Sequence, residues 1–297
     1  MPDLSVIIAS VNDPAYLGNC LKALRSQRGS VKAEVIVVTP LQQARLSALC
    51  RMHPDVRFLF ENRTRGIPEL RAIGLREAAA SVVAITEDHC IPADDWYLSI
   101  MRAHQQVLWS IIGGVVDNGA VGRLMDWAVY FCEYGSLASP LPEKNEVQPG
   151  APNVSYRRDV LEPVGEVVGE EYWDYFLHRA LLEKGVKLAM DSRIRVHHKM
   201  HFRFWGFLRE RWHYGRAFAG RRNRDMPALR RVALSILFPV IPFLMTFRIA
   251  RMALRRRNSL GLFFCCVPLI FLFQLAGSLG EFAGCAFGPG NSRLHLR

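Results

Sequence analysis

The sequence predicts an α/β protein, with a mostly parallel sheet flanked by helices, that continues into a helical membrane segment. Over the first 120 residues, short β-branched runs alternate with helical patterns, as a parallel sheet requires. Residues 201–297 hold 16 Lys and Arg against 3 Asp and Glu, and this third of the chain also contains the two most apolar runs. We therefore expect a domain over residues 1–226 and a membrane-associated region over residues 227–297.

The composition excludes several classes of protein. Half of the 297 residues are hydrophobic and 22% are charged, which excludes a disordered chain and a collagen-like fibre. The seven cysteines form no CxxC pair, so they indicate neither a zinc ribbon nor a secreted disulfide framework, and a reducing compartment is expected. The first residues do not have the pattern of a signal peptide, so the first domain should stay in the cytoplasm. Because the basic excess lies beside apolar runs, its expected partner is membrane lipid and not nucleic acid.

The elements of the first domain follow from the spacing of apolar residues. Strands are predicted over residues 4–9, 34–38, 56–60, 81–86, 111–117, 186–190 and 194–197. Helices are predicted over residues 17–27, 68–80 and 171–185. Residues 137–152 contain four prolines and are expected to form a loop over a site.

The fourth predicted strand ends in the polar cluster Glu87-Asp88-His89. Open α/β sheets bind ligands at the carboxyl ends of their strands. Carboxylate oxygens and an imidazole suit Mn²⁺ or Mg²⁺, and such a cation neutralises a diphosphate leaving group. The same cluster also fits an acidic turn that caps the next helix, and the motif alone does not separate the two interpretations.

Two apolar runs predict contact with a membrane. Residues 258–280 carry no charge over 23 positions, which predicts a transmembrane helix even with Pro268 inside it. Residues 232–247 are shorter and contain two prolines, so they are predicted to lie in the interface or to cross. Five arginines in residues 248–257 favour a cytoplasmic link if the first run does not cross. Residues 203–224 mix aromatic residues with arginines and are expected at the lipid headgroups, although Gly215-Arg216 would also suit a pyrophosphate.

Several motifs, in order, resemble the family 2 glycosyltransferases with the GT-A fold. The segment LSVIIASVND, residues 4–13, is similar to their opening strand and nucleotide-binding loop. Residues 65–86 resemble the helix and strand that lead into the metal motif, and Glu87-Asp88-His89 takes the place of the Asp-any-Asp motif itself. Residues 152–158 resemble the acceptor-side segment, and residues 173–185 resemble the helix with the catalytic carboxylate. The resemblance spans residues 3–200.

The resemblance implies a GT-A fold and an inverting transfer of a sugar from a nucleotide-diphospho-sugar donor. The acceptor, lipid-linked or a polysaccharide, would lie at the cytoplasmic face of the inner membrane. A divalent cation, Mn²⁺ or Mg²⁺, is implied at Glu87, Asp88 and His89. Donor binding is implied for Ser10, Asn12, Asp13, Thr39, Arg71, Glu87 and Asp88. The acceptor or phosphate side is implied for Asn153, His178, His198, Arg211 and Trp212.

Asp174 is the predicted catalytic base, because an inverting transfer needs one carboxylate to accept the proton of the acceptor hydroxyl. His178 lies four residues further on, on the same helical face, where it would orient this carboxylate or contact a phosphate. Two alternatives stay open: Asp174 is a surface carboxylate paired with Arg179, or the base is Glu170 or Glu171.

Other interpretations also stay open. Thr39 stands where the family commonly has an acidic pair, and Glu and His replace two aspartates, which would suit a catalytically degenerate GT-A domain acting as a membrane-bound nucleotide-binding or scaffold protein. A dinucleotide-dependent oxidoreductase is disfavoured, because no G-x-G-x-x-G follows the first strand. His197, His198 and His201 form either a contact to the metal or diphosphate or an interfacial polar cluster.

Overall fold

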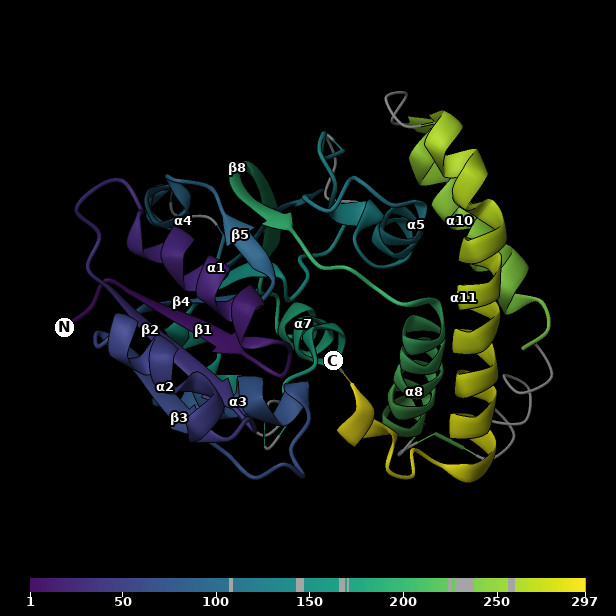
Figure 1. The fold of residues 1–297 in the computed structure, drawn as a ribbon, viewed down its shortest axis with the longest axis horizontal. Helices are drawn as coiled ribbons and strands as arrows, with labels where there is room; N and C mark the ends of the chain where they lie inside the picture. The colour runs from purple at the N-terminus through teal and green to yellow at the C-terminus, as the bar shows by residue number, and fades with distance from the viewer. Residues whose placement is uncertain are drawn as a thin grey trace. The chain divides into compact units, whose positions relative to one another are not determined.

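The computed structural model describes residues 1–106, 109–142, 147–165, 169, 171–223, 226–227, 238–255 and 260–296 (Figure 1). The chain divides into two units. The first unit comprises Met1–Gly119 and Leu137–Lys199, and the second comprises Ala120–Ser136 and Met200–Arg297. The sequence prediction put the domain boundary at residue 226, whereas this division assigns residues 120–136 and 200–226 to the second unit.

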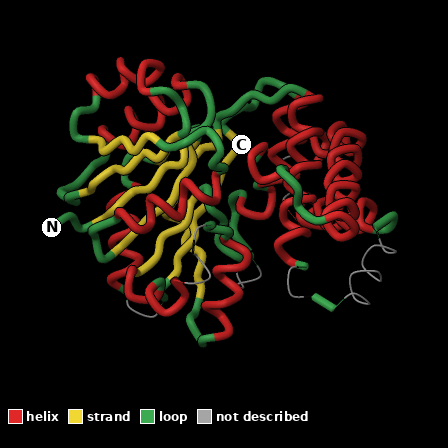
Figure 2. Tube along the Cα trace, turned by 90° about the horizontal axis from the view of Figure 1, so that it is seen from below, coloured by secondary structure: helices red, strands yellow, loops and turns green. Residues whose placement is uncertain are grey.

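The first unit contains an eight-stranded sheet with the strands side by side and helices packed against it (Figure 2). Its strands are β1 (Leu4–Ala9), β2 (Ala33–Thr39), β3 (Val56–Phe60), β4 (Val82–Glu87), β5 (Cys90–Pro92), β6 (Ile111–Asn118), β7 (Asn153–Arg157) and β8 (Leu188–His198). Their order is β3-β2-β1-β4-β7-β6-β8-β5. β1, β2, β3 and β4 pair in parallel, so their carboxyl ends meet at one edge of the sheet.

The second half of the sheet adds antiparallel pairs to the parallel ones, including the parallel pair of β6 and β8. β7 is antiparallel to both β4 and β6, and β5 is antiparallel to β8, so the sheet is mixed. The two strands predicted over residues 186–190 and 194–197 form the single strand β8. A register shift against β6 between Gly114 and Val115 absorbs the irregularity between them.

The described residues of this unit form the α-helices α1 (Pro14–Arg25), α2 (Gln43–Met52), α3 (Ile67–Glu77), α4 (Trp96–Gln105) and α7 (Asp174–Glu183). Short 3₁₀ turns cover Gly135–Leu137, Arg158–Val160 and Glu162–Val164. α1 buries Leu17, Cys20, Leu21 and Leu24, the four residues whose spacing predicted it. α7 begins at Asp174, three residues later than predicted, so Asp174 occupies its first turn.

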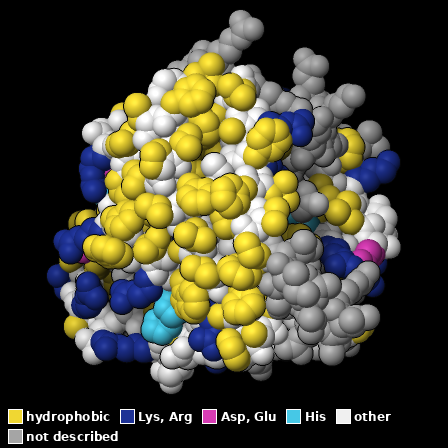
Figure 3. Space-filling view, turned by 90° about the vertical axis from the view of Figure 1, so that its right-hand side faces the viewer, with side chains coloured by type: hydrophobic (Ala, Val, Ile, Leu, Met, Phe, Trp, Pro, Cys, Tyr) yellow, Lys and Arg dark blue, Asp and Glu magenta, His cyan; other side chains and the backbone are white. Residues whose placement is uncertain are grey.

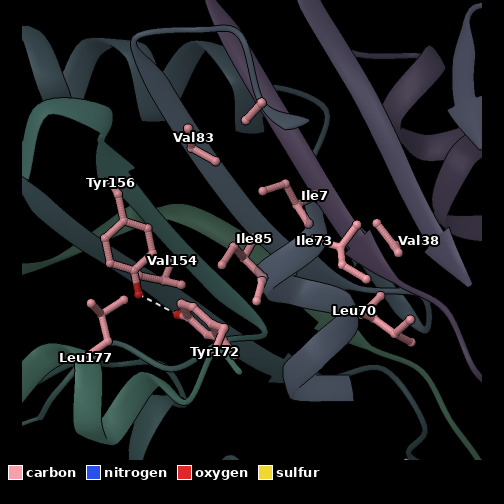
Figure 4. Packing of buried hydrophobic residues seen from close by; sticks show 14 of the residues in the cluster. Ile7, Val38, Leu70, Ile73, Val83, Ile85, Val154, Tyr156, Tyr172 and Leu177 are labelled. Carbon is pink, nitrogen blue, oxygen red and sulfur yellow. Dashed lines mark hydrogen bonds between the residues drawn. The ribbon is translucent and has the colours of Figure 1, made fainter. Parts of the chain in front are cut away.

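The core of this unit lies between the sheet and the helices α3 and α7 (Figure 4). Ile7, Ile85 and Val154 contribute from the strands, and Leu70 and Leu177 from the helices. The backbone of α3 lies so close to β1 that a Cβ at Gly74 would come within 2.4 Å of Ile7. This close packing fixes the helix that precedes β4 against the strand on which the nucleotide-binding loop was predicted.

The described part of the second unit is helical: α5 (Leu124–Glu133), α8 (Phe204–Arg222), α10 (Ile241–Arg255), α11 (Leu260–Phe287) and the 3₁₀ turn η5 (Ser292–His295). Aromatic contacts hold it together, with ring centroids 4.7 Å apart for Phe207 and Phe273 and 5.4 Å apart for Phe131 and Phe263. These contacts join α8 and α5 to α11, which explains why residues 120–136 belong to this unit.

Among the described residues, α11 is long and apolar enough to cross a membrane by length and composition, and 39% of its most apolar 18-residue window is buried. It covers the predicted transmembrane segment from residue 260 and extends it to Phe287. Of the shorter predicted run, residues 232–237 lie outside the described residues, and residues 241–247 form the start of α10.

Candidate functional site

Asp88 joins the carboxyl ends of β1 and β4. Its Oδ2 accepts hydrogen bonds from Ser10 Oγ (3.0 Å) and from the Asn12 backbone N–H (3.2 Å), and its Oδ1 accepts one from Asn12 Nδ2 (2.9 Å). The side chain is fully buried. Burial alone would raise the pKa of Asp88, but the hydrogen bonds from His89 and Asn12 lower it, so the carboxylate is ionised. Asp88 therefore fixes the loop after β1, and its oxygens bond inward.

Glu87 and His89 face each other beside this anchor. The distance between Glu87 Oε2 and His89 Nε2 is 3.2 Å, and Glu87 Oε1 accepts a hydrogen bond from Arg71 Nη2 (2.9 Å). Burial would raise the pKa of Glu87, but the hydrogen bond and charge of His89, together with Arg71, lower it to about 2. Burial would lower the pKa of His89, whereas its bonds to Asp88 and Glu87 raise it to about 10. Glu87, Asp88 and His89, together with Arg71, form a charged cluster in which each carboxylate has a cationic neighbour.

The cluster includes a group of side chains able to hold a cation. Ligand atoms of Glu87, His89 and Cys90 lie within 4.8 Å of one another. Burial, with the charge of Glu87, raises the pKa of the Cys90 thiol, so this thiol stays protonated and is a poor ligand. A carboxylate oxygen of Glu87 remains, and the imidazole nitrogen of His89 joins it only when a cation displaces the proton that the raised pKa holds on this ring. Both atoms fit Mn²⁺ or Mg²⁺ when phosphate oxygens complete the shell. Asp88 was predicted as a third ligand and does not belong to this group.

His198 is the one of the three predicted histidines that lies at this cluster. Its ring contacts the ring of His89 edge-on, with centroids 4.7 Å apart, because β5 pairs Cys90 with His198. Burial, together with the charge of His89, lowers the pKa of His198 well below its usual value, so it is neutral. His197 is exposed on the same strand, and His201 lies in the second unit, 2.7 Å from Asp126.

Two predicted donor-binding residues have local structural roles. Asp13 caps α1, since its Oδ1 accepts a hydrogen bond from the Ala15 N–H (2.9 Å). Thr39 is fully buried at the end of β2, where its Oγ1 accepts a hydrogen bond from the Leu41 N–H (3.1 Å). Thr39 thus shapes the turn where an acidic pair is common in the family.

Asp174 stands at the start of α7 with its carboxylate partly accessible. Its Oδ1 accepts from the Tyr175 N–H (2.8 Å) and its Oδ2 from the Ala151 N–H (3.2 Å). The alternative in which Asp174 pairs with Arg179 does not hold in the structure, because Arg179 pairs with Glu183 at 3.0 Å. Two backbone N–H groups therefore orient this carboxylate at the start of the helix.

His178 does not bond to Asp174 as predicted, but joins a buried tyrosine pair. Its Nε2 lies 2.7 Å from Tyr156 Oη, which lies 2.5 Å from Tyr172 Oη. Burial lowers the pKa of His178 to about 4 despite the charge of Asp174, so the imidazole is neutral and shares a hydrogen bond with the Tyr156 hydroxyl. Figure 4 shows the two tyrosine hydroxyls directed toward each other. Sequence reasoning missed both tyrosines, since neither belongs to a motif that marks a polar cluster.

The structure gives less support to the other two candidates for the base, Glu171 and Glu170. Glu171 is buried and its Oε2 accepts a hydrogen bond from Trp173 Nε1 (3.1 Å). Glu170 lies outside the described residues. Asp174 is therefore the better placed candidate for a base among those that the structure describes.

Asn153 was predicted on the acceptor side, and its placement does not fit that role. The residue is buried, and its Nδ2 donates to the carbonyls of Val115 (2.9 Å) and Ile194 (3.1 Å). Its Oδ1 accepts from Trp96 Nε1 (2.9 Å). An amide with both N–H groups and its oxygen engaged inside the protein serves to join β6, β8 and α4. A glycosylated Asn153 would require these bonds to break.

Arg211 and Trp212 belong to the second unit, on α8. Arg211 pairs with Glu133 at 2.5 Å, which joins α8 to α5. Trp212 lines an open groove of about 570 Å³ between α8 and α11, together with Trp205, Arg209 and Leu279. Of the Gly215-Arg216 pair, the arginine donates from Nε to the Gly288 carbonyl (3.0 Å). Arg211 and Arg216 are thus held by partners inside this unit.

Comparison with known proteins shows the family and the fold. Residues 5–164 match the sequence family described as Glycosyl transferase family 2. No curated protein sequence matches the chain. Among solved structures, the fold is similar to that of the mannosyltransferase PcManGT from Pyrobaculum calidifontis in complex with GDP-Man and Mn²⁺. The TM-score is 0.58 at 17% identity, over 94% of this chain and 87% of that one. This likeness is one of fold.

Proposed function

The chain belongs to glycosyltransferase family 2, and on that basis we propose that it transfers a hexose from a nucleotide-diphospho-sugar to an acceptor at the cytoplasmic face of a membrane. The observation that carries the proposal is the cluster at the carboxyl ends of β1 and β4. There Asp88 fixes the loop after β1 and Glu87 and His89 lie 3.2 Å apart. Ligands of open α/β sheets bind at this edge.

Donor binding is assigned to the loop after β1 and to the end of β4. Ser10 and Asn12 are held by Asp88, which gives the loop one conformation before the nucleotide arrives. Arg71 places a guanidinium against Glu87 and adds positive charge where a diphosphate would bind. The complex of the similar mannosyltransferase with GDP-Man supports a nucleotide sugar as the donor class.

A divalent cation would be held by Glu87 and His89, with His198 in contact behind His89. When bound, it neutralises the charge that develops on the departing nucleoside diphosphate. The presence of Mn²⁺ in the similar mannosyltransferase supports this assignment, and both Mn²⁺ and Mg²⁺ suit the two protein ligands.

Asp174 is assigned as the base of an inverting displacement. Its carboxylate accepts the proton of the acceptor hydroxyl while that oxygen bonds to the anomeric carbon and the bond to the diphosphate oxygen breaks. The Ala151 and Tyr175 N–H groups hold the carboxylate in place. The buried Tyr156–His178 pair stabilises the helix behind it.

The second unit supports an acceptor at a membrane, either lipid-linked or a polysaccharide made there. α10 and α11 expose large apolar side chains, among them Phe243, Phe247 and Phe264, each more than 60% exposed. Exposed apolar surface of this extent marks an interaction site. An enzyme held at a membrane meets its acceptor at high local concentration.

The test is a donor screen on the purified full chain. UDP, GDP and dTDP sugars are offered with Mn²⁺, with Mg²⁺ or with EDTA, and nucleoside diphosphate release and thermal stabilisation are measured. We expect metal-dependent release from one donor. Stabilisation by a donor without any release would instead favour the non-catalytic nucleotide-binding protein that Thr39 and the altered metal motif suggest. If no donor causes release and none stabilises the protein, both the transferase and the nucleotide-binding protein are contradicted.

A further inference from the structure

The exposed side of α11 is a single apolar stripe along the helix. Phe264, Leu272 and Leu279 are between 37% and 61% exposed, and they are spaced by eight and seven residues, which places them on one face. Along the described length of α11, the exposed residues are Gly261, Phe264, Cys265, Pro268, Leu272, Leu279, Ala286 and Phe287. None of them is charged, so this face suits lipid over the whole length of the helix.

α10 extends the stripe into a broad apolar face (Figure 3). Phe243 of α10 packs on Phe271 of α11, with ring centroids 5.0 Å apart. Leu244 and Phe247 are 56% and 61% exposed beside them. The exposed side chains that follow along α10 are Arg248, Arg251 and Leu254, which puts positive charge beside the apolar residues of this face.

The opposite side of α11 is occupied by α8, with almost no space between the two backbones. A Cβ at Gly280 would lie 2.1 Å from the Trp212 carbonyl oxygen, and one at Gly284 would lie 2.4 Å from that of Arg216. Arg222 of α8 pairs with Glu281 of α11 at 3.2 Å. α8 and the second half of α11 therefore form one closely packed pair.

α8 is not suited to hydrocarbon. In 19 residues it carries Arg209, Arg211, Arg216, Arg221 and Arg222, as well as Glu210. Each arginine at the centre of a bilayer is strongly unfavourable. If the half of α11 that packs on α8 lay in a bilayer, α8 would carry these charges into the lipid. The part of α11 before Phe273 is shorter than the about 20 residues that a crossing needs. The packing of α8 on α11 therefore opposes a transmembrane orientation.

Trp205 locates the helix pair relative to a lipid surface. It is 76% exposed on α8 and borders the groove that Arg209 and Leu279 also line. Tryptophan prefers the headgroup region, where its ring is apolar and its N–H reaches water. A helix pair with tryptophan and arginine beside an apolar stripe matches the interface and not the bilayer centre.

We propose that α10 and α11 lie in the plane of an anionic membrane, with the stripe Phe264–Leu272–Leu279 in the acyl region, and that α11 does not cross the bilayer. Arg248 and Arg251 then meet anionic headgroups. The inference rests on the membrane association included in the proposed function and is independent of the transfer reaction. It replaces the transmembrane helix predicted over residues 258–280.

The first test determines which side of the membrane the C-terminal end of α11 faces. Ser30→Cys and Asn291→Cys, both at exposed positions, are made separately in a Cys50→Ser/Cys265→Ser background. A membrane-impermeant maleimide is added to inverted vesicles and to intact spheroplasts, and detergent-solubilised protein gives the full signal. We expect both cysteines to react in inverted vesicles and neither in spheroplasts. Reaction of Asn291→Cys only from the outside would overturn the proposal and leave membrane association standing.

The second test measures how deeply three positions of α11 lie in the bilayer. A fluorophore is attached through Phe264→Cys, Leu272→Cys or Leu279→Cys, and the protein is bound to vesicles with quenchers near the headgroups or near the bilayer centre. An in-plane helix gives the same shallow depth at all three positions. A helix that crosses gives its deepest position at Leu272, which would contradict the proposal. Recovery of the unmodified chain in the supernatant of every vesicle preparation would instead contradict membrane association itself.

The third test measures how far binding depends on anionic lipid and on the two arginines of α10. Vesicles of phosphatidylcholine alone are compared with vesicles that also contain phosphatidylglycerol. The double variant Arg248→Gln/Arg251→Gln should bind the anionic vesicles roughly 5- to 30-fold more weakly, with little change on the neutral ones. The matched control Arg45→Gln/Arg51→Gln removes two exposed arginines of α2 and should not alter binding. Equal losses in both double variants would overturn the assignment of the membrane face.

Discussion

Asn12 donates two hydrogen bonds to Asp88, from its backbone N–H to Oδ2 (3.2 Å) and from Nδ2 to Oδ1 (2.9 Å). A residue of the predicted nucleotide-binding loop is thereby tied to the middle residue of the predicted metal motif. Ser10 Oγ also donates to Oδ2, and His89 Nδ1 lies 2.9 Å from Oδ1, so Asp88 connects the loop after β1 to the turn after β4. The middle residue of the motif thus holds the loop after β1, while its neighbours Glu87 and His89 lie 3.2 Å apart beside it.

Asp88→Asn should therefore act mainly on the loop. The amide replaces one acceptor oxygen by a donor that opposes Ser10 or Asn12, so we expect a loss of roughly 1–3 kcal/mol in the free energy of unfolding and a higher KM for the donor. Urea unfolding and donor kinetics measure the two effects. The exposed Asp55→Asn serves as control. A variant of unchanged stability that has lost only its response to the cation would return Asp88 to the role of a ligand.

Asp174→Asn tests the base. Asparagine keeps an oxygen for the Ala151 or Tyr175 N–H but cannot accept the proton, so turnover should fall by a factor on the order of 10² or more. Donor binding should stay nearly the same, since the proposed donor contacts lie elsewhere. Single-turnover rates and donor titration measure both quantities. Glu183→Gln on the same helix is the control, and an undiminished rate in Asp174→Asn would move the base to Glu171 or Glu170.

His104 provides a pH test away from the proposed site. It is buried with Nε2 2.9 Å from Ser155 Oγ, and burial, with the charge of Arg157, lowers its pKa to about 4. The folded protein thus binds this proton less readily than the unfolded chain, whose histidine pKa is about 6.5. The stability contributed by neutral His104 is complete above about pH 6.5 and is lost as the pH falls toward 4.

His104→Gln should reduce this acid sensitivity. Between pH 7.5 and pH 5, we expect the parent chain to lose ~2 kcal/mol of unfolding free energy through this residue, and the variant not to lose that share. Urea unfolding at the two pH values gives the comparison. His197→Gln is the control, because His197 is exposed on β8. If the parent chain and His104→Gln lost the same unfolding free energy between pH 7.5 and pH 5, another group would control the loss of stability in acid.

Local patterns predicted the elements whose structure depends on local sequence. Leu17, Cys20, Leu21 and Leu24 identified α1 because one helical face must be apolar. β1 and β3 were predicted to the residue because their runs are buried or bounded by turns. β7 was not recognised as a strand, since its antiparallel pairing with β4 and β6 depends on chain segments more than 40 residues away.

In the candidate site too, the sequence predicted what depends on neighbouring residues and not what depends on distant ones. The sequence predicted that Glu87, Asp88 and His89 end a buried strand, which the structure has, but not that Asp88 bonds to the loop after β1 while Glu87 and His89 meet. β4 ends at Glu87, and Asp88 and His89 form the turn before β5, so the directions of their side chains depend on a turn that the strand period does not describe. Asn153 was different, because only the packing of β6, β8 and α4 around it reveals that its amide is internal.

Gly280→Leu tests the contact on which the membrane orientation depends. Any side chain at this position meets the Trp212 carbonyl, at 2.1 Å for the Cβ alone, so α8 and α11 must separate. We expect a loss of about 1–3 kcal/mol or more in the stability of the second unit, seen as faster proteolysis of α8 in detergent. Gly261→Leu on the same helix is the matched control, because no atom lies within 4 Å of a Cβ there and leucine favours the helix. Equal protease resistance in both variants would mean that α8 does not pack on α11 at this point, and the argument against a membrane-crossing α11 would lose its main support.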